Sequence, residues 1–455
     1  MTGIETEVGS ERPVLPPSAD VREATATGKW MVLLAAFLGW MFDGMEMGIF
    51  PLIAGPALKD FGYEGANIAH WNGVFHTVFL IGAAFGGLVF GWLGDKIGRV
   101  RAMTLSVLAY SLFTGVGYFS TAPWQLAALR FLAALGMGGE WALGVSLVME
   151  IWPERLRPMM AGLIGAASNV GFALIAALGI FFQIKPGQWR WVMLAGAAPA
   201  VLTFFIRLFV PESHKWKAQV EHHGTAQPVR EIFSGRTLQV TLLGIAFASV
   251  ALIGTWGSVQ WIPLWVDKQL KPGDPTAKSV AQLLSSLGAV AGSLVAPLLG
   301  NLLGRRVTYF LLCAASLGAC AVLFRAFDSY NAAFLMTVAL VGLTTASFYG
   351  WLPLYLPELF HTRVRATGQG VSYNSGRILA AAGAMAAGGL VGFYNGSYAA
   401  SGATITLVYL AGMVLIWLAP ETKGKPLPET ADDLFGPPPP RRAFEPVLAD
   451  PAAKP

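Results

Sequence analysis

The sequence carries one set of charged and small residues twice, at a nearly constant separation. Glu150, Arg155, Arg157 and Gly162 recur as Glu358, Arg363, Arg365 and Gly370, each 208 positions later, and Pro211-Glu212 recurs as Pro420-Glu421, 209 positions later. In both halves these landmarks fall between long apolar segments. This pattern predicts two copies of one helical bundle, inserted in the same orientation.

Apolar runs occupy most of the chain and have the length that crosses a bilayer, which takes about 20 residues as a helix. They cover residues 29–53, 71–93, 102–121, 123–150, 158–183, 189–210, 238–265, 279–300, 306–326, 331–356, 366–393 and 402–419. Only 13% of the residues are charged, about half the share usual in a soluble globular protein. We therefore predict an all-α membrane protein with twelve transmembrane helices in two pseudo-symmetric six-helix bundles.

The polar segments between the runs set the expected domain limits. The bundles are expected at 29–210 and 238–420, with a cytoplasmic linker at 211–237. Residues 1–28 and 421–455 are predicted to be disordered tails. Lysines and arginines concentrate in the tails, the linker and alternate loops, which places both termini in the cytoplasm of a protein in the cell inner membrane.

Composition also excludes several classes of protein. The net charge of +5 follows from this topology and gives no reason to expect a nucleic-acid partner. The two cysteines, Cys313 and Cys320, share one apolar run and are expected to pack rather than to bind metal. The sequence contains no metal-ligand spacing, phosphate-binding loop or catalytic triad pattern. We expect no cofactor, no metal and no enzymatic activity, and we expect a monomer whose partners are lipid, protons and a small organic anion.

Four ionisable residues interrupt the apolar runs of the first half: Asp43, Glu46, Arg130 and Glu140. Charged groups inside a bilayer are costly, so each is a functional candidate for proton coupling. An Asp43–Arg130 pair would act as a proton switch, because protonating the acid frees the arginine; a static ion pair that only fixes helix packing is the alternative. Glu46 could face substrate, hold a second proton or mark the outer helix end. Glu140 could relay a proton or be a structural partner.

One arginine, Arg377, lies near mid-membrane in the eleventh run, with no acid in its own helix. Its planar guanidinium suits a carboxylate, so we expect it to bind an anionic substrate, although a structural pair with Glu358 or another acid is the alternative. The position 208 residues earlier is Asn169, so the two halves differ here. Tyrosine and tryptophan also favour the lipid interface, so part of the predicted substrate site could face lipid. Besides Arg377, that site comprises Asn374, Tyr373, Gln260, Trp256, Tyr355, Tyr349 and Asn169.

Charged residues at the inner helix ends form a second predicted group. Acids recur there at matched positions in both halves, which positive-inside topology alone does not explain. Exposed ion pairs are individually weak, so we expect a network that closes the cytoplasmic side. Its members are Asp95, Arg99, Glu150, Arg155, Arg157, Glu212, Glu358, Arg363, Arg365 and Glu421.

Several motifs resemble one superfamily of transporters. The loop Gly91-Trp-Leu-Gly-Asp-Lys-Ile-Gly-Arg-Val-Arg101 resembles the loop between helices 2 and 3 of the major facilitator superfamily. Phe42-Asp43, and Arg130 ahead of Gly136-Met-Gly138, look like the proton-coupled sugar porters of that superfamily. The G-x-G…G-R-I pattern around Arg377 resembles helix 11 of aromatic acid:proton symporters and organic anion transporters, in which the matching arginine is implicated in anion binding.

Two departures disfavour other branches of the superfamily. Helix 7 reads Trp256-Gly-Ser-Val-Gln260 where sugar porters carry a Gln-Gln run, and Gly165-Ala-Ala-Ser-Asn-Val-Gly171 lacks the Gly-Pro element of drug antiporters. Gly138-Gly-Glu-Trp141 is closer to metabolite, aromatic acid and sialic acid symporters. The resemblance therefore implies a proton-coupled symporter that imports a small organic anion, a carboxylate, by alternating access. A sugar or polyol porter of the same superfamily, with Arg377 structural, is the alternative.

Overall fold

The computed structural model describes residues 25–429 and 433, except 65, 183, 186 and 224–226. Helices dominate these residues, and no strand occurs among them. The first bundle contains α1 (Ala26–Asp60), α2 (Ala66–Ile97), α3 (Arg99–Val116), α4 (Pro123–Ile151), α5 (Arg157–Phe181), α6 (Trp189–Ala195) and α7 (Ala200–Phe209). The linker carries α8 (His214–His223) and α9 (Pro228–Ile232). Most of the two predicted tails, residues 1–24 and 434–455, lies outside the described residues.

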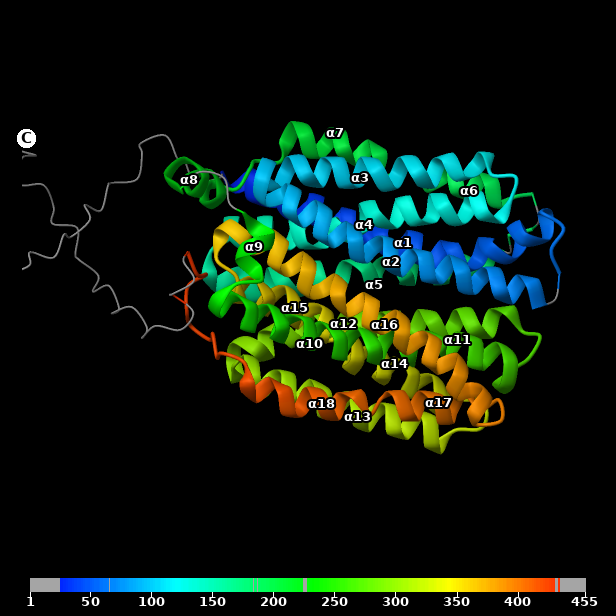
Figure 1. Cartoon of the computed structure of the whole chain (residues 1–455). Helices are drawn as coiled ribbons and strands as arrows, with labels where there is room; N and C mark the ends of the chain where they lie inside the picture. The colour runs from blue at the N-terminus through cyan, green and yellow to red at the C-terminus, as the bar shows by residue number, and fades with distance from the viewer. Residues whose placement is uncertain are drawn as a thin grey trace, which may run out of the picture.

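The second bundle lies alongside the first (Figure 1). It contains α10 (Gly235–Gly257), α11 (Ile262–Trp265), α12 (Pro275–Leu303), α13 (Arg305–Ala326), α14 (Ala332–Ala346), α15 (Phe348–Tyr355), α16 (Arg365–Phe393), α17 (Tyr398–Ile405) and α18 (Val408–Leu415). The described chain starts and stops at the end where α8 and α9 lie. We call this the linker end, and the opposite end the loop end.

Ten helices of the described chain are long and apolar enough to cross a membrane. The expected sixth run is helical but divided into α6 and α7 by a turn at residues 196–199. The expected eleventh run forms α16, a 29-residue helix that carries the polar residues Thr367, Gln369, Asn374 and Arg377 in its first half. Large apolar side chains such as Phe181 (78% exposed) cover the outer surface, as expected for helices that face lipid.

The duplication is visible at the linker end of each bundle. Gly98 before α3 and Gly304 before α13 adopt φ of 103° and 95°, a region open mainly to glycine. The Glu212 carboxylate accepts hydrogen bonds from the first two backbone N–H groups of α3, at 3.0 Å each. Glu421 does the same for α13, at 3.0 and 3.1 Å. An acid at a helix N-terminus is stabilised by the helix dipole, so the two Pro-Glu motifs are paired helix caps.

The bundles meet along two seams of different character. On one, α16 packs against α2 and α4 through buried hydrogen bonds, including Thr367 N to Asp95 Oδ2 at 2.8 Å and Gln369 Nε2 to Ser146 Oγ at 3.0 Å. On the other, α5 packs against α12 and α15 through small residues. A Cβ at Gly165 would lie 2.2 Å from the carbonyl oxygen of Tyr349, so this contact requires glycine.

Candidate functional site

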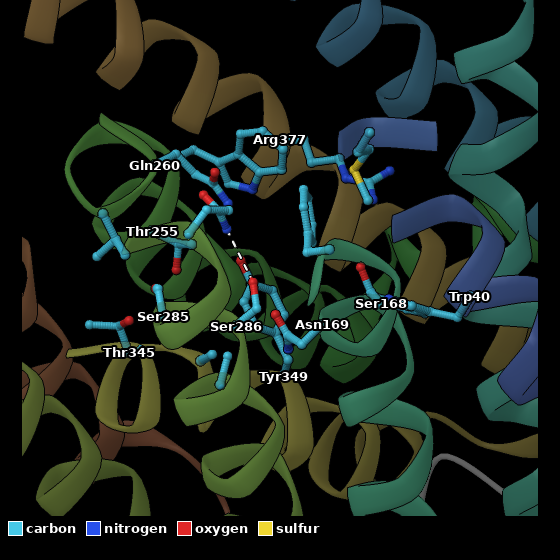
Figure 2. Close-up of a pocket in the computed structure, with 18 of the residues that line it drawn as sticks. Trp40, Ser168, Asn169, Thr255, Gln260, Ser285, Ser286, Thr345, Tyr349 and Arg377 are labelled. Atoms are coloured by element: carbon cyan, nitrogen blue, oxygen red, sulfur yellow. Dashed lines mark hydrogen bonds between the residues drawn. The ribbon is translucent and has the colours of Figure 1, made fainter. Parts of the chain in front are cut away.

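A pocket lies between the bundles (Figure 2). It encloses about 610 Å³ of space not filled by atoms, counting the solvent on its open side. The first bundle contributes side chains from α1 and α5. The second contributes α10, α12, α14, α15, α16 and the turn at Val259–Trp261.

Arg377 lines the pocket from α16 and is 5% exposed. Its Nη1 donates to Asn374 Oδ1 at 2.9 Å, and its guanidinium carbon lies 5.1 Å from the centroid of the Tyr373 ring. Asn374 Nδ2 in turn donates to the Gly138 carbonyl of α4 at 3.0 Å. Within the described residues no carboxylate lies within 4.0 Å of this guanidinium. Burial of an unpaired charge is unfavourable, so a group that supplies negative charge would stabilise Arg377 here.

Arg130 makes a different pair from the predicted one. Its Nη1 forms a buried ion pair with Glu46 of α1, not with Asp43. Its guanidinium carbon also lies 4.1 Å from the Phe50 ring centroid and 4.3 Å from that of Phe79, which satisfies the cation further. The predicted Asp43–Arg130 pair is therefore wrong. Asp43 and Glu46 are three residues apart on one face of α1. Arg130 lies level with Glu46, the acid nearer the loop end, and therefore pairs with it.

Asp43 and Glu140 form a separate acidic cluster. They are 3% and 2% exposed. A Cβ at Gly39 would lie 1.7 Å from Glu140 Oε1, so the Glu140 carboxyl rests on α1 one turn from Asp43. Asp43 Oδ1 and both Glu140 carboxyl oxygens accept no hydrogen bond from any other described residue, and the two carboxyls interact with each other. The charges of Arg377 and Glu140 both act on the Asp43 carboxyl.

Three aromatic rings pack against one another at the edge of the pocket. Trp141 stacks on Tyr373 at a centroid distance of 4.2 Å. Trp40 meets both rings edge-on, at 5.4 and 6.0 Å, and lines the pocket with Tyr373. Arg377 lies over the Tyr373 ring, so its guanidinium contacts this aromatic group directly.

The other residues predicted for the substrate site divide into three groups. Trp256, Gln260, Tyr349, Tyr373 and Asn169 line the pocket together with Arg377. Asn374 is fully buried behind Arg377 and positions it.

Tyr355 is placed elsewhere, and its assignment to the substrate site is wrong. Its hydroxyl donates to the carbonyl oxygen of Pro420 at 2.6 Å, and its ring packs 4.6 Å from that of Trp351. Both contacts lie toward the linker end. The residue fixes the start of the C-terminal segment on the second bundle, so it is structural.

Several pocket residues were not predicted from the sequence. They are polar or aromatic side chains on otherwise apolar helices: Trp40, Ser168, Thr255, Gln282, Ser285, Ser286 and Thr345. The signal that could have found part of this set is the spacing of Gln282, Ser285, Ser286 and Ala289, which places all four on one face of α12.

The predicted gate residues form an ion-pair network at the linker end. Glu150 of α4 bonds Arg99 at 3.2 Å and Arg365 of the second bundle at 2.8 Å. Asp95 bonds Arg99 at 3.1 Å and accepts from Thr367 at the start of α16. These buried links join the two bundles, so the pocket is closed toward the linker end in this conformation.

The remaining gate candidates are less central. Glu358 pairs with Arg305 at 2.6 Å inside the second bundle, Arg157 pairs with Glu154, and Arg363 pairs with Glu231. Arg155 is exposed and forms no ion pair with a described residue.

The last two gate candidates, Glu212 and Glu421, are the helix caps described above, and they differ in pKa. Burial raises the pKa of Glu212, whereas at Glu421 the backbone N–H donors outweigh burial and lower the pKa.

The chain matches the Major Facilitator Superfamily over residues 32–378. It is 29% identical to the niacin transporter of Acinetobacter baylyi over 437 residues, covering 88% of this chain and 95% of the relative. It is also 29% identical to the probable 4-methylmuconolactone transporter of Cupriavidus pinatubonensis over 397 residues, covering 86% and 90%. A solved structure of the proton:xylose symporter bound to 6-bromo-6-deoxy-D-glucose superimposes with a TM-score of 0.75 at 16% identity, covering 91% of this chain and all of that one.

The protein thus has the fold of a multi-pass membrane transporter. It belongs to the Major Facilitator Superfamily. The predicted fold class, an all-α membrane protein with the major facilitator fold of two helical bundles, is confirmed. Members of this family are transporters rather than enzymes.

Proposed function

We propose that this protein imports a small organic anion, a carboxylate, together with protons across the cytoplasmic membrane by alternating access. The observation that carries the proposal is Arg377, a buried guanidinium that faces the pocket between the bundles with no acid within ion-pair distance among the described residues. A carboxylate would supply the missing charge and could accept two parallel hydrogen bonds from the guanidinium.

The named relatives support an acid as the cargo. Niacin and 4-methylmuconolactone, the compounds in the names of two relatives, each carry one carboxylate. The xylose symporter shares the fold at low identity and therefore says nothing about the cargo here.

In the proposed mechanism, Asp43 and Glu140 hold the coupled proton. Two adjacent carboxyls with unpartnered oxygens in a dry interior disfavour a double negative charge, so one ionised acid shares the field of Arg377 in the empty site. An incoming carboxylate takes over Arg377, and the acid that loses this cation then binds a proton. Glu46 and Arg130 stay paired and hold α1 against α4.

Release requires the linker end to open. We assign this end to the cytoplasm, with both termini on that side, from the distribution of basic residues. The Glu150–Arg365 and Asp95–Thr367 links then form the closed inner gate, and the loop end is the side from which the anion enters. The protein works as a monomer, because the proposed pathway lies between the two bundles of one chain.

Transport by purified protein in liposomes tests this function. An inward proton gradient should accelerate uptake of a labelled carboxylate such as nicotinate and drive its accumulation, and a protonophore should abolish the accumulation. Uptake of a neutral sugar with no effect of the gradient, and no uptake of any acid, would overturn the proposal in favour of a sugar or polyol porter.

A further inference from the structure

A ring contact crosses between the two bundles beside the pocket. His76 of α2 lies against Trp256 of α10, with the ring centroids 5.7 Å apart and the ring planes at 55°. Trp256 lines the pocket, and His76 stands outside the lining. The contact therefore joins the wall of the pocket to a helix of the opposite bundle.

This contact lies nearer the loop end than Arg377 does. α2 begins at Ala66, close to the loop end, and runs toward the linker end (Figure 1). Asn374, the neighbour of Arg377, packs on α2 at Gly87, where an added Cβ would lie 1.9 Å from Asn374 Nδ2. His76 precedes Gly87 on the same helix, by a length of about 16 Å at the helical rise per residue. The ring contact is therefore on the loop-end side of the site.

On the opposite side of the pocket, α5 and α12 stay packed almost to the loop end. An added Cβ at Gly162, near the linker end of α5, would lie 3.2 Å from Leu294 Cα. One at Gly179, near the loop end, would lie 3.2 Å from Ser279 Oγ. This seam follows the length of both helices and can serve as a pivot, so widening of the loop end would separate α2 from α10.

The two side chains suit a contact that forms and breaks. His76 is exposed although it lies about three turns inside α2, so its ring borders the gap between the bundles. Trp256 stands one residue before the end of α10 at Gly257, and its carbonyl accepts from Trp261 Nε1 at 3.2 Å across that break. A pair of aromatic rings shifts an equilibrium by about two- to tenfold, which biases closure without making it permanent.

We propose that His76 and Trp256 form the loop-end gate of the pocket, the contact that closes the bundles on the side opposite the Glu150–Arg365 network. His76 is a positioning residue here, because it acts on the pocket through Trp256. The inference rests on the proposed function in one respect, that the pocket opens to the two ends in turn. It adds the residues that close the loop end.

Thiol labelling tests this gate without any cargo. Ser285 lines the pocket (Figure 2), so Ser285→Cys places a reactive thiol inside it. Ser146 is 0% exposed and accepts a hydrogen bond from Gln369 of α16, so Ser146→Cys reports opening at the linker end. Cys313 and Cys320 are buried and should add little background. A polar maleimide is the probe, applied to the purified full-length protein in detergent.

Removal of the imidazole should open the loop end alone. His76→Ala should speed labelling of Ser285→Cys by about two- to tenfold and should not speed labelling of Ser146→Cys. His76→Phe keeps a ring against Trp256 and should restore the slow rate. His70→Ala is the matched control, because His70 lies on the same helix with its ring 6.0 Å from that of Trp71, also on α2, and it should label at the wild-type rate.

Two results would overturn the gate. One is a pocket thiol that reacts equally fast with and without the His76 ring. The other is faster labelling of both thiols in His76→Ala, since this indicates general loosening of the bundles.

The outcomes also separate the gate from the function on which it rests. If labelling depends on His76 as expected and no carboxylate enters proteoliposomes, the gate stands and the proposed cargo and coupling are wrong. If nicotinate is imported with protons and labelling does not depend on His76, the function stands and the gate assignment is wrong.

Discussion

The two homologous bundles carry opposite charges in their interiors, near the pocket and at its lining. On the first bundle, α1 and α4 hold an ion pair, Glu46–Arg130, and beside it the acids Asp43 and Glu140 with unpartnered oxygens. On the second, α16 contributes one cation, Arg377, within an uncharged polar wall. The sequence position that matches Arg377 in the first half is Asn169, which also lines the pocket. The two halves therefore share the fold but differ in charge, and we call them the proposed proton-binding side and the proposed anion-binding side.

The largest expected effect distinguishes the two acids of α1, Asp43 and Glu46, by their contribution to stability. Glu46→Gln leaves the buried Arg130 cation unpaired, which costs about 3–5 kcal/mol of stability, whereas Asp43→Asn removes no ion pair and should cost far less. Thermal unfolding in detergent measures both. The double variant Glu46→Gln, Arg130→Met should recover most of the loss. Equal stability of Glu46→Gln and wild type would contradict the observed pairing.

The anion-binding side depends on one guanidinium. Arg377→Ala should weaken binding of a carboxylate by about 100-fold or more, because a buried charge-assisted contact is lost. Arg377→Lys should bind the carboxylate with an affinity between those of wild type and Arg377→Ala, since lysine keeps the charge but not the planar guanidinium. Calorimetric titration gives the affinities, with Arg325→Ala on the exposed end of α13 as the control. Retained affinity in Arg377→Ala would make the arginine structural.

The proton-binding side should control accumulation rather than affinity for the anion. A gradient of one pH unit can drive about tenfold accumulation through one coupled proton, because one unit equals about 1.4 kcal/mol. Asp43→Asn and Glu140→Gln should each lower the ratio of internal to external anion concentration toward one. Exchange of internal for external anion should continue in both variants. Proteoliposomes loaded with unlabelled acid measure the exchange. Full accumulation in both variants would move the proton site elsewhere.

The smallest effect concerns Asn374, which connects the two sides. Asn374→Ala removes the hydrogen bond that orients Arg377 and the bond to Gly138 O, so affinity should fall about three- to tenfold. Gln369→Ala is the matched control. Gln369 lies on α16, as Asn374 does, and its substitution removes an inter-bundle hydrogen bond to Ser146 of α4 without changing a contact of Arg377. An equal loss in both variants would mean that bundle contact, and not arginine orientation, sets the affinity.

The sequence predicted the fold because lipid imposes strong rules on it. Apolar length gave the helices, and the repeated Glu150 and Glu358 landmarks gave the duplication. The intramembrane charges were found for the same reason, since Asp43, Arg130 and Arg377 stand out in apolar helices. Their roles in transport stay predictions.

The sequence did not predict how deep in the membrane each side chain lies, and it did not mark the small polar residues of the pocket. Residue spacing placed Asp43 and Glu46 on one face but could not show which acid Arg130 reaches. Tyr355 is an aromatic residue with a hydroxyl group, a type common in binding pockets. Its position along the helix instead brings its hydroxyl to the carbonyl oxygen of Pro420. Hydroxyl residues such as Ser286 and Thr345 were missed because they bond within their own helix or to a neighbouring side chain and are common in apolar helices.

The dependence of carboxylate affinity on pH is the most direct test of the division between the two sides. If anion binding at Arg377 is linked to protonation of Asp43 and Glu140, wild-type affinity should fall by up to about tenfold per pH unit over the range in which this pair holds one proton in the empty site and two in the anion-bound site. The double variant Asp43→Asn, Glu140→Gln should bind the anion with an affinity that does not change over the same pH range. The same pH slope in the double variant and in wild type would contradict the account.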